Sequence, residues 1–141
     1  MNSVVHESGA ALAYGAVGIA LMALGYLVVE VTTPGRLGDQ IWLERNRGAA
    51  LILAAKLLGV GTIVATAIVT SDDGLAQGLL DTSVFGVLGI VLTVVAFYLL
   101  DLLTPGKLGA TIVASDVLHP ACWVVAAADL ATAGIVAAAI S

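Results

Sequence analysis

Charged residues are scarce in this sequence, which has 141 residues but only 5 lysines and arginines and 10 aspartates and glutamates. Hydrophobic residues make up 60% of the chain, and the mean hydropathy is +1.10. An ordinary water-soluble domain carries about 25% charged residues and does not reach this hydropathy. The shortage of charge therefore excludes a soluble domain and indicates an integral membrane protein.

Cysteine is nearly absent as well, since Cys122 is the single one. One cysteine excludes an internal disulfide and a metal site built from several cysteines. His119 lies one helical turn before Cys122, but no second histidine or cysteine is close to them in the sequence, and a zinc site needs three or four ligands. We interpret His119 followed by Pro120 as the start of a helix with proline in its first turn.

Other functional patterns are also missing from the sequence. No nucleophile is paired with a base and no glycine-rich phosphate loop follows a strand, so we expect no catalytic residues, no metal, no cofactor and no enzymatic activity. The formal net charge is −5 and there is no basic stripe, which argues against nucleic acid as a partner.

The N-terminal segment does not look like a signal peptide, because the first 15 residues hold no lysine or arginine. A cleaved signal peptide is therefore not expected, and the first helix should remain in the mature protein.

Long apolar runs fill most of the chain. There are four of them, at about 10–31, 48–69, 82–103 and 119–140. Roughly 20 helical residues cross a hydrocarbon core of about 30 Å. The sequence therefore predicts an all-α integral membrane protein with four transmembrane helices, in a single membrane domain that covers residues 1–141 and has the lipid bilayer as its surroundings.

The second half of the chain repeats the first. Tyr14–Gly38 and Phe85–Gly109 match in their glycines, aromatics, one acid and a Thr-Pro-Gly sequence, and the match resumes with a shift of one residue near the end of each half. We interpret this as an internal duplication with repeats at about 10–71 and 82–141. Because each repeat crosses the membrane twice, both enter from the same side, which makes them parallel repeats.

The same three residues follow the first helix of each repeat. They are Thr33, Pro34 and Gly35 in the first repeat and Thr104, Pro105 and Gly106 in the second. Proline cannot continue a helix, and glycine adopts the positive backbone angles that end one. The Thr-Pro-Gly sequence thus predicts a helix stop, and the shared basic residue, leucine and glycine after it favour a loop of one fixed shape. The short amphipathic runs that follow suit the membrane interface, with Trp42 as an anchor.

Basic residues are concentrated in the two Thr-Pro-Gly loops, which hold Arg36, Arg45, Arg47 and Lys107. The N-terminal tail, the C-terminus and the loop that we expect at 70–81 hold none. The positive-inside rule therefore predicts that both Thr-Pro-Gly loops face the cytoplasm and that both termini lie outside.

Lys56 and Asp129 are the two charged residues placed deep in the predicted spans. Counting 1.5 Å per residue puts their backbones roughly 13 and 15 Å into the membrane. An unpaired charge there costs between about 2.5 and more than 10 kcal/mol, so the simplest prediction is that they pair. One interpretation is a structural ion pair between the second and fourth spans. In a second interpretation, the Lys56 side chain snorkels to the headgroups, while Asp129 is protonated or hydrogen-bonded to Thr132 or another hydroxyl. A third interpretation is a site that handles protons or ions.

Glu30 and Asp101 are matched acids, each three residues before its Thr-Pro pair. Each carboxylate can bond to the neighbouring turn or pair with a basic residue at the membrane boundary. Alternatively, the two acids belong to a ring around a cation path, which would favour metal ions or polyamines.

Small residues recur every three or four positions along the first and third spans. The glycines among them are Gly15, Gly18 and Gly25 in the first span and Gly86 and Gly89 in the third. Residues at this spacing share one helical face, and small residues let helices approach closely in lipid. We interpret both lines as packing seams, which can meet each other, face the remaining helices or join subunits.

Together these motifs resemble a known family. The openings YGAVG and FGVLG and the acids before Thr-Pro-Gly, in EVTTPGRLG and DLLTPGKLG, resemble the bacterial inner-membrane proteins grouped as domain of unknown function family 350. The resemblance covers nearly the whole chain. It implies a multi-pass, four-helix protein of the bacterial cytoplasmic membrane, often encoded beside membrane-stress or polyamine-synthase-like genes, and supplies no established activity. Such proteins tend to have an asparagine near the start of each repeat's second helix; Asn46 fits, whereas Leu118 and His119 stand at the second position.

Two functions follow as expectations. The first is a non-enzymatic scaffold or component of a membrane-stress or envelope complex, which docks partner membrane or cytoplasmic proteins through its Thr-Pro-Gly loops and forms homo-oligomers. The alternative is a small oligomeric transporter or channel for metal ions or polyamines, in which Glu30 and Asp101 select cations and Lys56 with Asp129 forms the gate.

Overall fold

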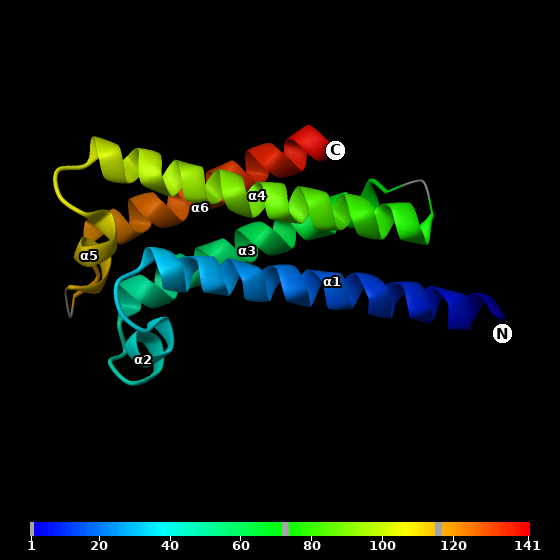
Figure 1. Ribbon diagram of the computed structural model, residues 1–141, viewed down its shortest axis with the longest axis horizontal. Helices are drawn as coiled ribbons and strands as arrows, with labels where there is room; N and C mark the ends of the chain where they lie inside the picture. Colours follow the sequence, from blue (N-terminus) through cyan, green and yellow to red (C-terminus); the bar gives the residue numbers. More distant parts are fainter. Residues whose placement is uncertain (1, 72–73, 115–116) are drawn as a thin grey trace.

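The computed structural model describes residues 2–71, 74–114 and 117–141, and six helices form in this part of the chain. In order, they are α1 (Asn2–Thr32), α2 (Leu37–Trp42), α3 (Arg47–Val69), α4 (Leu75–Leu103), α5 (Leu108–Val113) and α6 (Pro120–Ile140) (Figure 1). The helices α1, α3, α4 and α6 are long and apolar enough to cross a membrane. The prediction of an all-α protein with four transmembrane helices is therefore confirmed.

Two of the long helices, α1 and α4, begin well before the apolar runs that predict them. α1 begins at Asn2 rather than near residue 10, and α4 begins at Leu75 rather than near residue 82. The loop predicted at 70–81 is therefore wrong from Leu75 onward, where the structure has the first turns of α4. Leucine, alanine and glutamine are good helix formers, and Gln77 donates a hydrogen bond of 2.9 Å to Asp81 one turn later. Hydropathy marks where a helix enters lipid, and the helix itself begins earlier.

The four long helices alternate in direction. In Figure 1, α1 and α4 run the same way, and α3 and α6 run back. The short helices α2 and α5 lie at one end of the bundle, which we call the loop end, and the two termini lie toward the other, the terminal end (Figure 1). Two parallel repeats remain a prediction, and they would also place both short helices at one end.

Three hydrophobic clusters hold the helices together. The cluster at the loop end joins both short helices to the long ones through Val29, Leu37, Ala49, Ile52, Leu108, Ile112, Cys122 and Val125. A second cluster joins α1, α3 and α4 through Leu21, Val60, Val64 and Ile90. A third joins α3 and α6 through Ile63, Ala133 and Val136. α3 contributes to all three clusters and is the central helix of the bundle.

The two Thr-Pro-Gly loops have the same backbone shape. Gly35 and Gly106 have φ angles of 97° and 104°. The residues that follow, Arg36 and Lys107, have φ and ψ of −97° and 111° and of −94° and 113°. Each loop then leads into a helix of 6 residues. The structure thus has the fixed loop shape that the repeated sequence predicts.

The glycines of α4 are sites of close helix packing. A Cβ atom on Gly86 would lie 2.4 Å from Cδ1 of Leu21 in α1, and one on Gly89 would lie 2.3 Å from Cδ1 of Ile63 in α3. Real Cβ atoms do not approach other atoms this closely, so a larger residue at either position would force the side chain of Leu21 or Ile63 to move. The seam on α4 therefore receives side chains from two neighbouring helices.

The glycines of α1 pack more loosely. Cβ atoms on Gly18 and Gly25 would lie 3.4 and 3.3 Å from the side chains of Val64 and Val60 in α3. A Cβ on Gly15 would have no neighbour within 4 Å. Within this chain, Gly15 therefore makes no close contact with a neighbouring helix. The glycine lines of α1 and α4 face side chains of neighbouring helices rather than each other.

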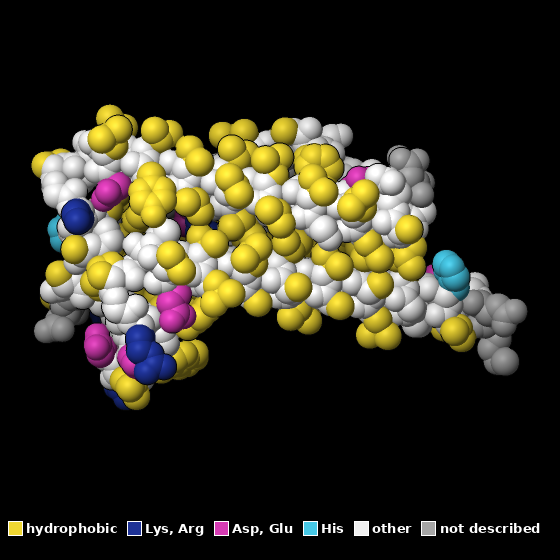
Figure 2. Space-filling view, in the orientation of Figure 1, with side chains coloured by type: hydrophobic (Ala, Val, Ile, Leu, Met, Phe, Trp, Pro, Cys, Tyr) yellow, Lys and Arg dark blue, Asp and Glu magenta, His cyan; other side chains and the backbone are white. Residues whose placement is uncertain are grey.

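The surface separates apolar and charged regions along the bundle. Figure 2 shows hydrophobic side chains over α1 and α4, while lysine, arginine and most acidic side chains of this face gather at the loop end, around α2 and α5. A surface of this kind suits helices surrounded by lipid with one end in the polar headgroup region.

Candidate functional site

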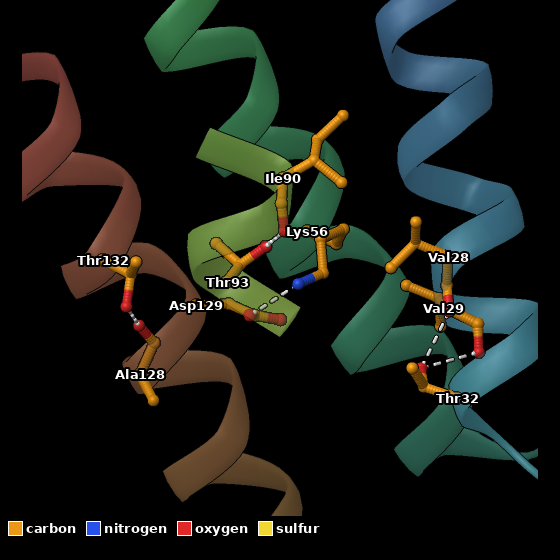
Figure 3. A network of polar contacts seen from close by, with 9 residues as sticks. All are labelled: Val28, Val29, Thr32, Lys56, Ile90, Thr93, Ala128, Asp129 and Thr132. Carbon is orange, nitrogen blue, oxygen red and sulfur yellow. Dashed lines mark hydrogen bonds and ion pairs between the residues drawn. The ribbon is translucent and has the colours of Figure 1, made fainter. Parts of the chain in front are cut away.

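Lys56 of α3 and Asp129 of α6 form a buried ion pair. Nζ of Lys56 lies 2.7 Å from Oδ1 of Asp129, and their side chains are only 5% and 4% exposed (Figure 3). The structure thus joins the two residues as their similar depth predicts. Lys56 does not snorkel to the surface, and Asp129 bonds to Lys56 rather than to Thr132.

Small residues one turn beyond the pair bring the two helices close. A Cβ on Gly59 would lie only 2.9 Å from Cβ of Ala133. Gly59 follows Lys56 by three positions in α3, and Ala133 follows Asp129 by four in α6. Since aspartate has a short side chain, it can reach Lys56 only where the two backbones approach each other. Gly59 and Ala133 are not among the residues predicted from the sequence, although a small residue one turn after each buried charge is a signal that could have found them.

The hydroxyl groups around the pair bond within their own helices. Thr93 donates to the carbonyl of Ile90 at 2.8 Å, and Thr132 donates to that of Ala128 at 2.8 Å (Figure 3). Such bonds to a preceding turn are typical of threonine in apolar helices. The charges of Lys56 and Asp129 are thus neutralised by each other rather than by a wider polar network.

A cavity beside the pair is too small for a hydrated ion. It has a volume of about 10 Å³, and Lys56, Asp129, Thr32 and Thr33 are its polar lining residues. A space of this size holds one water molecule at most. The ion pair is therefore a neutral contact between α3 and α6 with room beside it for no more than one water molecule.

The matched acids at the loop end differ in their contacts. Oδ1 of Asp101 accepts a hydrogen bond of 2.6 Å from the backbone amide of Leu108, the first residue of α5. The corresponding residues of the first half are Glu30 and Leu37, and within the described residues no hydrogen bond joins them. Asp101 therefore agrees with the interpretation that the acid holds the neighbouring turn, while half-buried Glu30 has no such contact.

The two Thr-Pro-Gly loops share one threonine hydrogen bond but differ in threonine burial and in a second contact. Thr33 is buried and donates to the carbonyl of Val29, whereas Thr104 is exposed and donates to that of Leu100 at 2.7 Å. In the first loop, Nε2 of buried Gln40 donates to the carbonyl of Pro34 at 2.6 Å. Gln40 is not among the residues predicted from the sequence, because Thr111 stands at the corresponding position of the second half and the repeat does not reveal it.

Asn46 connects the two halves of the chain at the loop end. Its Oδ1 accepts from the amide of Ala49 at 3.0 Å and so caps α3, and its Nδ2 donates to the carbonyl of Val113 at the end of α5, at 3.1 Å. At the start of α6, Nδ1 of His119 accepts from the amide of Ala121 at 3.1 Å. His119 thus replaces asparagine as a helix cap but makes no corresponding bridge within the described residues.

The described residues include no group of three or more histidine, cysteine, aspartate or glutamate side chains that could hold a metal ion. His119 and Cys122 instead belong to the first turn of α6, where the amide of Cys122 donates to the carbonyl of His119 at 2.9 Å.

Sequence comparison identifies relatives along the whole chain. Residues 3–140 match the family described as Domain of Unknown Function (DUF350). A UPF0719 transmembrane protein of Mycolicibacterium paratuberculosis is 34% identical over 141 residues, which is 100% of this chain and 93% of that protein. UPF0719 transmembrane proteins of Mycobacterium bovis and Mycobacterium tuberculosis are also 34% identical, over 100% of this chain and 92% of each relative. Comparison with solved structures gives no match.

Proposed function

We propose that this chain, which belongs to the family described as Domain of Unknown Function (DUF350), is a non-enzymatic scaffold that docks partner proteins at its loop end. The observation that carries the proposal is the shared shape of the two Thr-Pro-Gly loops. Gly35 and Gly106 adopt nearly the same positive φ, 97° and 104°, and both loops lie at one end of the bundle (Figure 1). A rigid, exposed loop surface binds a partner with little loss of conformational entropy.

Exposed side chains at the loop end support docking. Trp42 and Leu43, at the end of α2, are 80% and 76% exposed. Tryptophan is enriched among the residues that dominate binding energy in protein interfaces. The same end carries four basic residues, Arg36, Arg45, Arg47 and Lys107. By the positive-inside rule it faces the cytoplasm, with both termini outside, so the partner is a cytoplasmic protein or the cytoplasmic part of a membrane protein.

The closed interior also favours a scaffold. Lys56 and Asp129 neutralise each other at 2.7 Å, and the adjacent cavity of about 10 Å³ cannot pass a hydrated cation or a polyamine. A protein whose interior charges are fully used for packing performs its function at the surface. We propose that it does so in a bacterial cytoplasmic membrane, as a component of a membrane-stress or envelope complex.

Photo-crosslinking in intact membranes tests the docking proposal. A photoreactive amino acid at Trp42 or Leu43 should give adducts with other proteins, while one at Leu12 should give few. Leu12 is a suitable control because it is 75% exposed and lies in the first half of α1, away from the Thr-Pro-Gly loop that follows this helix. Replacing both Gly35 and Gly106 by valine should remove the adducts while the helical content is kept. Adducts with lipid alone at Trp42 and Leu43 would contradict docking.

Transport remains the second candidate, because an intramembrane ion pair lies beside a cavity. In this alternative, oligomers carry metal ions or polyamines past Glu30 and Asp101, and Lys56 with Asp129 forms the gate. Ion flux in liposomes tests it with a folded variant in which Lys56→Met and Asp129→Asn are combined. An unchanged flux in that variant would exclude a gate formed by these two residues.

A further inference from the structure

A continuous groove runs along the outside of the bundle between α1 and α4. Its apolar part has a volume of about 330 Å³ and is lined by residues that include Leu24, Val28 and Val94. Its mouth at the loop end has a volume of about 310 Å³ and is lined by residues that include Asp101 and Lys107. The two parts share the lining residues Val31, Thr32 and Tyr98, so they form one depression that joins an apolar trough to a charged mouth.

The length of the trough fits one acyl chain. From Leu24 to Thr32 the helix α1 advances eight residues, or about 12 Å at 1.5 Å per residue. One leaflet of a hydrocarbon core is about 15 Å thick. Leu24 and Leu27 are 38% and 55% exposed, so the trough is open to lipid along its length. An acyl chain whose headgroup lies at the loop end would therefore extend along the trough nearly to the middle of the bilayer.

The mouth of the groove carries one charge of each sign. Asp101 is held in place because its Oδ1 accepts the amide hydrogen of Leu108 at 2.6 Å. Lys107 is exposed, and within the described residues it forms no salt bridge. A phosphodiester accepts charge-assisted hydrogen bonds from an ammonium group, and a primary ammonium donates them to a carboxylate. The pair is thus complementary to a headgroup that contains both a phosphate and a primary amine.

We propose that this groove binds an aminophospholipid of the leaflet at the loop end. Lys107 holds the phosphate, Oδ2 of Asp101 accepts from the primary ammonium group, and one acyl chain lies along α1 and α4. A net anionic headgroup is disfavoured because the carboxylate of Asp101 repels it. A quaternary ammonium headgroup is disfavoured because it has no N–H to donate.

The repeat supplies matched controls for each part of the site. Val31 and Leu102 are corresponding residues with nearly equal exposure, 83% and 82%, but only Val31 lines the groove. Lys107 corresponds to Arg36, whose side chain is 82% exposed and pairs with Asp39 at 3.5 Å outside the groove. Val31→Trp and Lys107→Ala therefore test the groove, and Leu102→Trp and Arg36→Ala control for general effects on the membrane surface.

The experiment uses the full chain in detergent, with bound lipid counted by native mass spectrometry. The probes are dioleoyl phosphatidylethanolamine, phosphatidylglycerol and phosphatidylcholine. We expect one tightly bound phosphatidylethanolamine, with an apparent affinity lowered about fivefold by Lys107→Ala and about tenfold by Val31→Trp, and unchanged by Arg36→Ala and Leu102→Trp. Asp101→Asn keeps an acceptor for the amide of Leu108 but should abolish the preference for phosphatidylethanolamine over phosphatidylcholine.

Two results would overturn the proposal. One is equal affinity for the three lipids in the unmodified protein, which would identify the groove as an ordinary lipid contact. The other is an equal loss of affinity in each groove variant and its matched control. Circular dichroism of every variant separates a loss of lipid from a loss of fold, and Leu102→Trp has the same bulk as Val31→Trp on a comparably exposed surface.

Discussion

Lys56 Nζ and Asp129 Oδ1 lie 2.7 Å apart although the residues are 73 positions apart in the chain. The bond joins α3 in the first half of the chain to α6 in the second, at a place where both side chains are buried. A buried pair adds little net stability over a well-packed apolar contact, but the loss of one member leaves an uncompensated charge. We therefore expect the pair to favour the correct alignment of α3 with α6, because misaligned helices would each bury an unpaired charge.

Double-mutant analysis tests that role. Asp129→Asn and Lys56→Met should each lower the free energy of unfolding by about 3–5 kcal/mol, because each leaves the other residue without its ionic partner. The double variant should lose less than the sum, since neither charge remains. Thermal unfolding in detergent, followed by circular dichroism, measures the coupling. Thr132→Val is the control, because the hydroxyl of Thr132 bonds to Ala128 in its own helix and not to the ion pair. Additive losses in the double variant would show that the two charges are not coupled.

The close approach of α3 and α6 gives a second prediction. Gly59→Ala should destabilise the protein by about 1–3 kcal/mol, because the new Cβ would lie 2.9 Å from Cβ of Ala133 and neither methyl group can move aside. Gly61→Ala, in the same helix, should be neutral or stabilising by about 0.5–1 kcal/mol, because its Cβ would meet no atom within 4 Å. Unfolding temperatures of the two variants check this. Equal effects would show that packing against Ala133 is not the cause.

The loop glycines give a third prediction. Gly35→Ala and Gly106→Ala should each cost about 1–2 kcal/mol, because both positions have positive φ. Gly35→Ala should cost about 1 kcal/mol more, because its Cβ would lie 2.6 Å from Nε2 of Gln40 and would break that side chain's bond to Pro34, whereas Gly106 has open space. With Gln40→Ala in the background, the two variants should become equal in thermal unfolding. A difference that persists would contradict this explanation.

The sequence predicts the parts of the fold that depend on composition and on repetition. Apolar length identifies the four spans, and the energetic penalty of an unpaired charge predicts that Lys56 and Asp129 meet. It does not predict which neighbour each glycine faces, because that depends on how α1, α3 and α4 cross. The repeat even misleads at Glu30 and Asp101. They match in sequence, but only Asp101 bonds to the helix that follows it.

Cysteine labelling tests the proposed orientation. Cys122 is fully buried, so the unmodified protein should react little with a membrane-impermeant thiol reagent. Arg36→Cys and Lys107→Cys should both be protected in intact cells and become labelled after the membrane is opened, because the positive-inside rule places the loop end in the cytoplasm. Ser141→Cys, at the exposed C-terminus, should be labelled in intact cells. Labelling of positions 36 and 107 from opposite sides would contradict the parallel arrangement.

Asn46 offers a way to separate helix capping from the contact between the two halves. Asn46→Ala should lower stability by about 2 kcal/mol, because it removes both the cap of α3 and the bond to Val113. Asn46→Asp keeps an oxygen for the amide of Ala49 but has no Nδ2 to donate to the carbonyl of Val113. The loss in Asn46→Asp should therefore be about 1 kcal/mol, arising from the bridge alone. Hydrogen exchange of α5 distinguishes the two effects, since Asn46→Asp should speed exchange in Leu108–Val113 while leaving the first turn of α3 protected. If that turn also loses protection, the side chain acts mainly as a cap, and the halves are held at this end by the apolar cluster alone.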